Sequence, residues 1–199
     1  LVDGRDRFSD SGLLVGLRLL ANPSVRIELN KELRAQFEAF QESGLSLSHV
    51  DSHLHMHMHP LIFGWVNEMA LEYGASGLRI PQDDLGLSMS YEKEGFLRKS
   101  VWYLIYRLLA ISANRRISQP PLLSAQRVYG LLQSGHMAES YTLKLLHSLK
   151  HSLVEIYFHP SLKESSDELG PNPQDFQSLT SPAVRALIQE RNYRLVNYR

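Results

Sequence analysis

The sequence predicts an α/β fold with mostly parallel strands, and three observations support this. Segments with apolar residues three or four positions apart alternate along the chain with short strand-like segments. Pro and Gly residues mark most of the boundaries between them. The 199 residues, 43% of them hydrophobic and 21% charged, suit one domain over residues 1–199. Alternation of this kind is typical of βαβ units.

The first part of the chain has clear helix and strand signals. Apolar residues recur at i, i+4 and i+7 from Leu33, which places them on one helical face. From Leu47 onward, apolar and polar residues alternate with the period of a strand. Pro60 and Gly74 are typical of the start and the end of a helix. We therefore predict a helix over 27–43, a strand over 47–54, a helix over 61–73 and a strand over 77–81.

The alternation continues in the second part. A polar loop over 82–94 leads to a long apolar helix over 96–117, which several Arg and Lys residues interrupt. Because this helix has no clean run of about 20 apolar residues, we expect no transmembrane segment. Pro120 and Pro121 then break the chain. Beyond them we predict a strand over 127–131, a helix over 137–149, a strand over 153–160, a loop to 180, a helix over 182–191 and a strand over 194–198.

Composition excludes several classes of partner and site. Lys and Arg total 21, as do Asp and Glu, so the net charge is zero and we expect no nucleic-acid partner. No cysteine is present, so any metal must be held by imidazole and carboxylate groups. The lack of cysteine fits a reducing compartment, and no signal peptide is visible, so we expect a cytoplasmic location.

Five of the nine histidines fall within the run HVDSHLHMHMH, residues 49–59. On a strand, His53 and His55 would point the same way and could both reach one metal ion. Asp51 shares that face, as a ligand or, in our preferred interpretation, as a group that orients an imidazole. A histidine cluster in the core or on the surface, with no metal, is the alternative.

Two other residues end predicted strands, where parallel α/β folds gather their chemistry. His159 closes LVEIYFHP and is a candidate general acid, although a lone His at the end of an apolar strand is more often a packing residue. Arg79 lies near the end of GLRIP, where an ordinary surface ion pair is the alternative.

The run HVDSHLHMHMHP resembles the HxDSHxHxHxxP signature of the YdjC-like carbohydrate deacetylases, which include the ChbG-type chitooligosaccharide deacetylases. GLRIP, EIYFHP and SPAVRALIQERNYRLVNY are similar to segments of that family in the same order. RVYGLLQSGHM followed by LVEIYFHP is most similar to the HpnK-type members associated with hopanoid biosynthesis.

The resemblance implies a distorted (β/α) barrel with a divalent ion, Mg or Zn, held by one Asp and two His. A metal-bound water would attack an acetamide carbonyl. Carried over to this sequence, it makes His53 a metal ligand and His159 the general acid that protonates the departing sugar amine. His55 and His57 would line the site or support its ligands, and Arg79 would orient a catalytic carboxylate.

The chain departs from the family at its start. The family begins with an Asp-Asp-Phe-Gly strand and later supplies a Gly-x-His ligand, whereas residues 1–8 are similar to the stretch that follows these motifs. We therefore expect an incomplete barrel that lacks its N-terminal strands, in a chain that is inactive by itself. Another metal-dependent barrel, of the amidohydrolase or phosphoesterase type, and an inactive fragment are the alternatives.

The implied partner is an acetylated amino sugar. The HpnK-type features favour a lipid-linked one, an N-acetylglucosaminyl hopanoid, with the apolar helix over 96–117 shaping a pocket for its tail. The sequence does not determine the oligomeric state, and a homodimer stays open.

Overall fold

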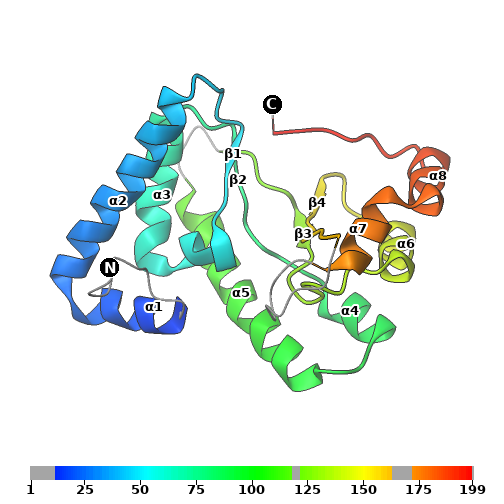
Figure 1. Ribbon diagram of the computed structural model, residues 1–199. Coiled ribbons are helices and arrows are strands. Elements are labelled where there is room, and N and C mark those ends of the chain that lie inside the picture. The colour runs from blue at the N-terminus through cyan, green and yellow to red at the C-terminus, as the bar shows by residue number, and fades with distance from the viewer. Residues whose placement is uncertain (1–11, 118–121, 163–171, 199) are drawn as a thin grey trace. The chain divides into compact units, whose positions relative to one another are not determined.

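The structure is a computed structural model that describes residues 12–117, 122–162 and 172–198, and its elements are labelled in Figure 1. It is a mixed α/β structure with short parallel strands, as predicted. Its residues divide into two units. Unit 1 contains Leu1–Arg79, Leu109–Ser124 and Asn197–Arg199, and unit 2 contains Ile80–Leu108 and Ala125–Val196. The expected single domain stays a prediction.

Unit 1 is built around three helices and a pair of parallel strands. They are α1 (Gly12–Ala21), α2 (Pro23–Glu42), β1 (His49–Val50), the 3₁₀ segment η1 (His53–Met58), α3 (Pro60–Glu72) and β2 (Gly77–Leu78). The predicted helices in this region are confirmed, but α2 starts before residue 27. The reason is local, because Asn22 Oδ1 accepts a hydrogen bond from the Ser24 N–H at 2.9 Å and Pro23 occupies the first turn.

The strands of unit 1 place two polar residues beside each other. His49 pairs with Gly77 and Val50 with Leu78 in a parallel register, so both strands run toward the same edge. The Arg79 N–H continues the ladder by donating to the Val50 carbonyl at 3.0 Å. The residues that follow the two strands, Asp51 and Arg79, therefore meet at one edge.

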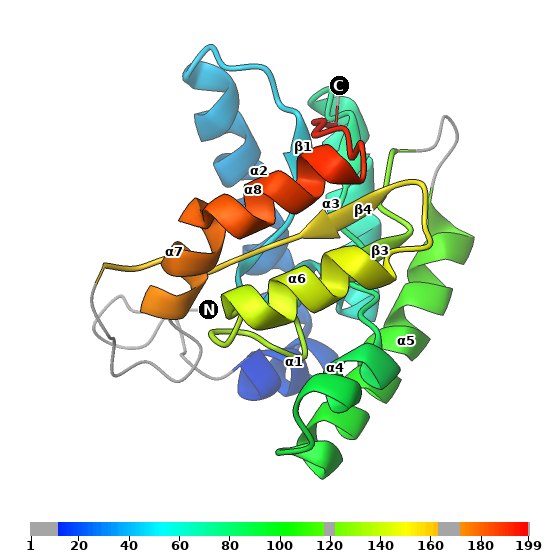
Figure 2. The same cartoon turned by 90° about the vertical axis from the view of Figure 1, so that its right-hand side faces the viewer.

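Unit 2 contains the second parallel pair and the remaining helices. They are α4 (Leu85–Tyr91), the part of α5 (Phe96–Arg116) up to Leu108, β3 (Arg127–Tyr129), α6 (Glu139–Ser148), β4 (Val154–Ile156), α7 (Pro173–Thr180) and α8 (Pro182–Glu190). The helices α6, α7 and α8 contact one another beside β4, as Figure 2 shows. The core here combines Tyr129, Met137, Tyr141 and Leu145 with the partly buried Ile156 and Phe158.

The close approach of β3 and β4 depends on a glycine. Gly130 has a φ of 124°, and a Cβ atom placed there would lie 2.7 Å from the Tyr157 carbonyl oxygen. Any other residue would strain the backbone and collide with the neighbouring segment. Only glycine therefore lets the chain turn at the end of β3 while it stays beside β4.

Two predicted loops contain helices that a single capping residue starts. The predicted polar loop over 82–94 is wrong, because α4 forms there with Asp84 Oδ1 accepting from the Leu87 N–H at 2.9 Å. The predicted loop to 180 is also wrong, because Asn172 caps α7 and Pro173 fills its first turn. The break at 119–121 and residues 1–8 and 163–171 lie outside the described residues.

The strand prediction at the end of the chain is wrong. Residues 194–198 form no strand with any described residue. Alternation alone does not make a strand, because the ladder needs a partner. The Tyr198 ring instead stacks on the His49 ring, with their centroids 4.8 Å apart. Separately, among the described residues no helix is both long enough and apolar enough to cross a membrane.

Candidate functional site

The histidine run begins with β1 and continues past its end, and Ser52 explains why the strand stops after Val50. Its carbonyl accepts from the His55 N–H, and its Oγ accepts from the His57 N–H at 2.9 Å. A serine that takes up main-chain hydrogen bonds in this way turns the chain out of a strand. The prediction of a strand over 47–54 is therefore wrong beyond Val50, and His53–Met58 forms η1 instead.

This turn separates the histidines that a strand would have placed together. Leu54 and His55 both have a φ of 52°, in the left-handed region, which reverses the direction of the side chains. His53 is exposed, whereas His55 is buried and lies edge-on to His57 with ring centroids 6.2 Å apart. The expectation that His53 and His55 point the same way is wrong, because it assumed strand geometry.

His57 is fixed at both of its ring nitrogens. Its Nδ1 lies 2.8 Å from Ser52 Oγ, and its Nε2 lies 2.7 Å from the Arg79 carbonyl oxygen. A carbonyl oxygen can only accept, so we assign the proton to Nε2 and let the Ser52 hydroxyl donate to Nδ1. His57 therefore joins the histidine run to the residue that follows β2.

Asp51 and Arg79 form an ion pair at the shared edge of β1 and β2. The Arg79 side chain is only 14% exposed and the Asp51 side chain 40% exposed, so solvent screens the pair only in part. The main chain of Arg79 is fixed, because its carbonyl oxygen is bonded to His57 Nε2 and its N–H donates to the Val50 carbonyl. The point from which the guanidinium side chain extends is therefore fixed as well. The carboxylate that pairs with Arg79 is therefore Asp51.

His159 lies in unit 2, just beyond β4, and a buried carboxylate fixes its main chain. Its N–H donates to Asp175 Oδ2 at 2.8 Å, and its carbonyl accepts from the Asn172 N–H at 2.7 Å. Its partly buried ring stands edge-on to Tyr157, with centroids 5.7 Å apart. Asp175 is fully buried, and its other oxygen accepts from the Met137 N–H at 3.0 Å.

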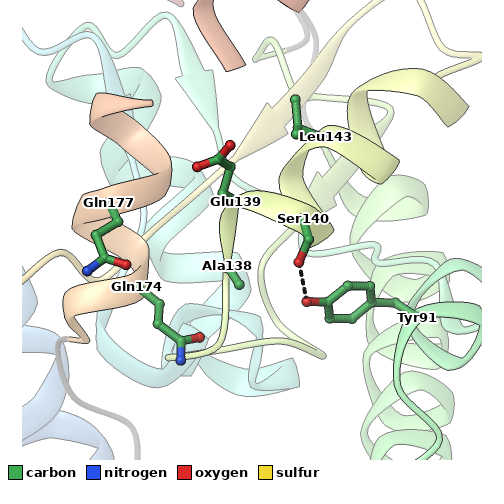
Figure 3. A pocket seen from close by; sticks show the side chains of 7 residues that line it. All are labelled: Tyr91, Ala138, Glu139, Ser140, Leu143, Gln174 and Gln177. Carbon is green, nitrogen blue, oxygen red and sulfur yellow. Dashed lines mark hydrogen bonds between the residues drawn. The ribbon is translucent and has the colours of Figure 1, made fainter. Parts of the chain in front are cut away.

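A pocket of about 520 Å³ opens on unit 2 near these residues, as Figure 3 shows. It is lined by Tyr91, Ala138, Glu139, Ser140, Leu143, Gln174 and Gln177. The Tyr91 hydroxyl and the Ser140 Oγ are 2.6 Å apart. Ala138 and Gln174 are sequence neighbours of Met137 and Asp175, so Asp175 connects the pocket wall to the main chain of His159. Amide, hydroxyl and carboxylate groups around one tyrosine suit a ligand rich in hydroxyl groups.

The comparisons with known proteins decide the family. The YdjC-like protein family matches residues 1–190, which is nearly the whole chain. The chain belongs to the YdjC-like family.

Individual relatives of the YdjC-like chain have informative names. It is 39% identical over 74 residues to a carbohydrate deacetylase of Geobacillus stearothermophilus, which covers 37% of this chain and 27% of that protein. It is 27% identical over 154 residues to a carbohydrate deacetylase of Vibrio parahaemolyticus, covering 75% and 57%. It is also 27% identical over 179 residues to a chitooligosaccharide deacetylase of Escherichia fergusonii, covering 86% and 60%. The YdjC-like chain thus spans less than two thirds of each of these relatives.

The described residues of the YdjC-like chain do not by themselves fit a complete metal centre. Across 12–117, 122–162 and 172–198, no group of three His, Asp or Glu side chains is placed to hold an ion. His57 uses both ring nitrogens in hydrogen bonds, and the His59 Nδ1 accepts from the Leu61 N–H at the start of α3. Within the histidine run, His53 is exposed, whereas His55 and His57 are buried.

Sequence reasoning missed Ser52 and Asp175. Ser52 was read as a strand residue, although Asp-Ser pairs favour local turns and were a usable signal. Asp175 follows Asn172 and Pro173, a pattern that predicts only the start of a helix. Its two acceptor bonds to Met137 and His159 span 38 and 16 residues, and no local pattern announces them.

The pKa of His57 predicts a stability change with pH. Burial lowers this pKa below its ordinary value of 6.5, so the unfolded chain binds the proton more readily than the folded protein. The neutral His57 therefore contributes to stability above pH 6.5, and this contribution is lost as the pH falls from 6.5 toward the pKa of His57 in the folded protein. Urea unfolding at about pH 7.5 and about pH 5.5 should show a smaller loss in His57→Gln than in wild type. The pKa of His59 is also lowered by burial, so part of the loss should persist. An equal loss in both proteins would contradict the prediction.

Proposed function

We propose that the YdjC-like chain is part of a metal-dependent hydrolase that removes the N-acetyl group from an amino sugar. The observation that carries the proposal is the Asp51–Arg79 ion pair beside the exposed His53, at the carboxyl ends of two parallel strands. Parallel α/β folds place their catalytic groups at this edge. The names of the relatives support the reaction class. We further propose that the described elements belong to an incomplete, distorted (β/α) barrel.

We propose that the side chains of His53, Asp51 and Arg79, all in unit 1, take part in the reaction. His53 would be a metal ligand, with further ligands from outside the described residues. A divalent ion, Mg or Zn, supplies a bound water of lowered pKa and polarises a carbonyl when it is present. Arg79 keeps the Asp51 carboxylate in one orientation beside His53, and His57 keeps Arg79 in place. His55, buried beside His57, supports the turn that exposes His53.

In unit 2, we propose His159 as the general acid. Amide hydrolysis releases an amine that must take up a proton, and an imidazole is the side chain best suited to deliver one near neutral pH. The ring of His159 is only partly buried, so a substrate nitrogen can approach it. Asp175 and Asn172 hold its main chain, which fixes the origin of the side chain.

The pocket beside Asp175 suits the sugar part of the proposed substrate. Glu139, Gln174 and Gln177 offer hydrogen-bond partners for hydroxyl groups, and the Tyr91 ring offers an apolar surface. We propose that this pocket binds a sugar residue of the substrate. We propose more specifically that the substrate is an N-acetylglucosaminyl hopanoid. The similarity of RVYGLLQSGHM and LVEIYFHP to HpnK-type proteins supports this proposal.

The decisive experiment measures acetate release. The natural protein that carries these residues, expressed at full length, should release acetate from N-acetylated chitooligosaccharides in the presence of Mg or Zn, and less after EDTA treatment. His53→Ala should lose most of this activity. It should also bind the metal more weakly in calorimetry, by more than the roughly 10- to 100-fold that supporting residues contribute. Undiminished metal binding in His53→Ala would exclude its proposed role. Phosphate release from a phosphomonoester without acetate release would favour the phosphoesterase alternative.

A further inference from the structure

A row of large apolar side chains lies exposed on α5, in the part of the helix that belongs to unit 2. Leu97, Val101, Leu104 and Leu108 are 76%, 49%, 55% and 59% exposed. Their spacing of i, i+4, i+7 and i+11 places all four on one face of the helix. An apolar row of this kind normally faces the core of a protein.

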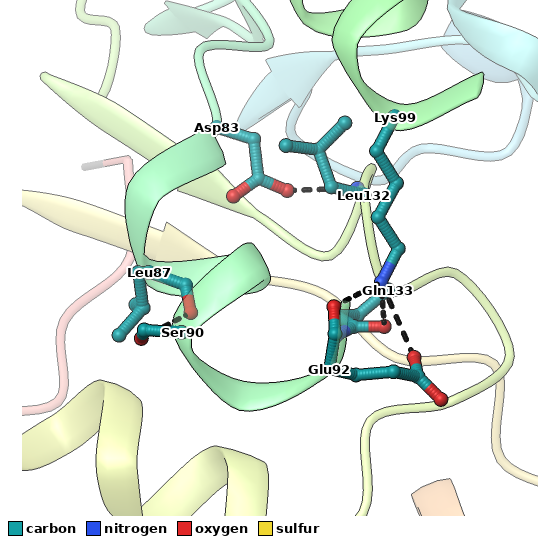
Figure 4. A network of polar contacts seen from close by, with 7 residues as sticks. All are labelled: Asp83, Leu87, Ser90, Glu92, Lys99, Leu132 and Gln133. Atoms are coloured by element: carbon teal, nitrogen blue, oxygen red, sulfur yellow. Dashed lines mark hydrogen bonds and ion pairs between the residues drawn. The ribbon is translucent and has the colours of Figure 1, made fainter. Parts of the chain in front are cut away.

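The opposite face of α5 attaches the helix to unit 2. Lys99 and Tyr106 are only 3% and 8% exposed. Figure 4 shows the Lys99 side chain pointing inward, where its Nζ lies 3.3 Å from Gln133 Oε1 and 3.2 Å from Glu92 Oε2. The helix therefore buries a lysine and a tyrosine while it exposes its leucines. This arrangement leaves the leucine row available to another partner.

Positive charge borders the leucine row on both sides. At about 100° per residue, Arg98 and Arg107 fall on opposite flanks of the row, and both are exposed. None of the 21 residues of α5 is acidic. Trp102, 47% exposed, lies beyond Arg98 on the same side. Although the net charge of the chain is zero, this surface is locally basic.

We propose that this face, defined by Leu97, Val101, Leu104 and Leu108 with Arg98 and Arg107, binds the surface of a bilayer that contains anionic lipid. The helix would lie in the interface, with leucines among the acyl chains and arginines at the headgroups. The proposal does not depend on the deacetylase activity.

Charge complementarity favours a lipid surface as the occupant of this face. A second copy of α5 would bring two more arginines to the border of the leucine row and no acidic residue to pair with them. Anionic headgroups supply the opposite charge, and each basic residue near such a surface strengthens binding.

The test is co-sedimentation of the protein with vesicles. Wild type should bind vesicles of phosphatidylcholine mixed with phosphatidylglycerol, and added salt or pure phosphatidylcholine should weaken the binding. Leu104→Gln or Leu108→Gln should each reduce binding by about tenfold, since a buried leucine is lost. The double change of Arg98→Gln and Arg107→Gln should reduce binding to the anionic vesicles by about tenfold or more, but change binding to pure phosphatidylcholine little.

Matched controls come from the same unit. Leu195 is 81% exposed outside the helix and Arg185 is an exposed arginine of α8, so Leu195→Gln and Arg185→Gln should bind as wild type does. Circular dichroism checks that each variant is folded.

Three results would overturn the proposal. One is a folded wild-type protein that binds neither kind of vesicle. Another is binding that falls equally in Leu104→Gln and Leu195→Gln. The third is sedimentation of a dimer that Leu104→Gln dissociates, in a protein that binds no vesicles, because the face would then bind a second copy.

Discussion

Replacing His159 with Gln should lower kcat for N-acetyl hydrolysis by about 100- to 10,000-fold in the full-length protein, with little change in KM. Glutamine retains a polar side chain but cannot deliver a proton to the departing amine. Acetate release against substrate concentration gives both kcat and KM.

Asp175→Asn is the matched control for a positioning role. In wild type, the Asp175 carboxylate accepts hydrogen bonds from the N–H groups of Met137 and His159. The amide of asparagine would turn its own N–H group toward one of these donors, so the main chain of His159 should shift. We expect a smaller fall in kcat than for His159→Gln, because the imidazole is still present. Wild-type kcat in His159→Gln would remove His159 from the mechanism, whatever Asp175→Asn does.

Replacing Asp83 with Ala should lower the free energy of unfolding by about 3 kcal/mol. Asp83 is buried in unit 2, and its carboxylate accepts from the N–H groups of Gly130 at 3.3 Å and Asp84 at 2.7 Å. It also accepts from the Leu132 N–H at 2.9 Å, as Figure 4 shows. Burial raises the pKa of Asp83 although all three donors favour the charged form. Alanine would leave these donors, two of them in the turn after β3, without their acceptor.

The neighbouring Asp84 provides the control for Asp83. Asp84 is exposed, and its side chain caps only α4 through the Leu87 N–H. Asp84→Ala should therefore cost about 1 kcal/mol, the usual value for an N-cap. Urea unfolding curves of the two variants make the comparison. If Asp84→Ala were as damaging as Asp83→Ala, the loss would come from α4 and not from the turn after β3.

Sequence periodicity predicted α2, α3, α5, α6 and α8, because it reports which face of a helix is apolar, but it did not predict α1, α4 and α7. The helix over 96–117 was predicted within one residue of α5, although several of its leucines are exposed. The spacing of its apolar residues predicts a helix, but this spacing does not indicate what covers the apolar face. The strands were predicted too long for a related reason. β1 ends at Val50 because Ser52 turns the chain out of the strand, whereas the alternation of residues continues past that turn.

The candidate site was predictable in composition but not in geometry. The histidine run and the strand-end positions of Arg79 and His159 could be read directly from the sequence. The separation of His53 from His55 could not, because it depends on left-handed backbone at Leu54 and His55 that is atypical of such residues. The roles of Asp83 and Asp175 could not be predicted from the sequence either. Each buried carboxylate accepts hydrogen bonds from main-chain N–H groups far away along the chain, and no local sequence pattern indicates such bonds.

The hydrogen-bonded series from Ser52 through His57 to the Arg79 carbonyl limits how this protein can be redesigned. Changing Ser52 alone strands a ring nitrogen and an N–H group of His57, and changing His57 alone strands the hydroxyl and the carbonyl. Replacing both by apolar residues of matched shape leaves fewer orphaned groups, so the two positions are energetically coupled. A mutational library that varies one position at a time would lose the variants at each of these positions, because each single change is destabilising. Only a library that varies Ser52 and His57 together would reach other stable pairs.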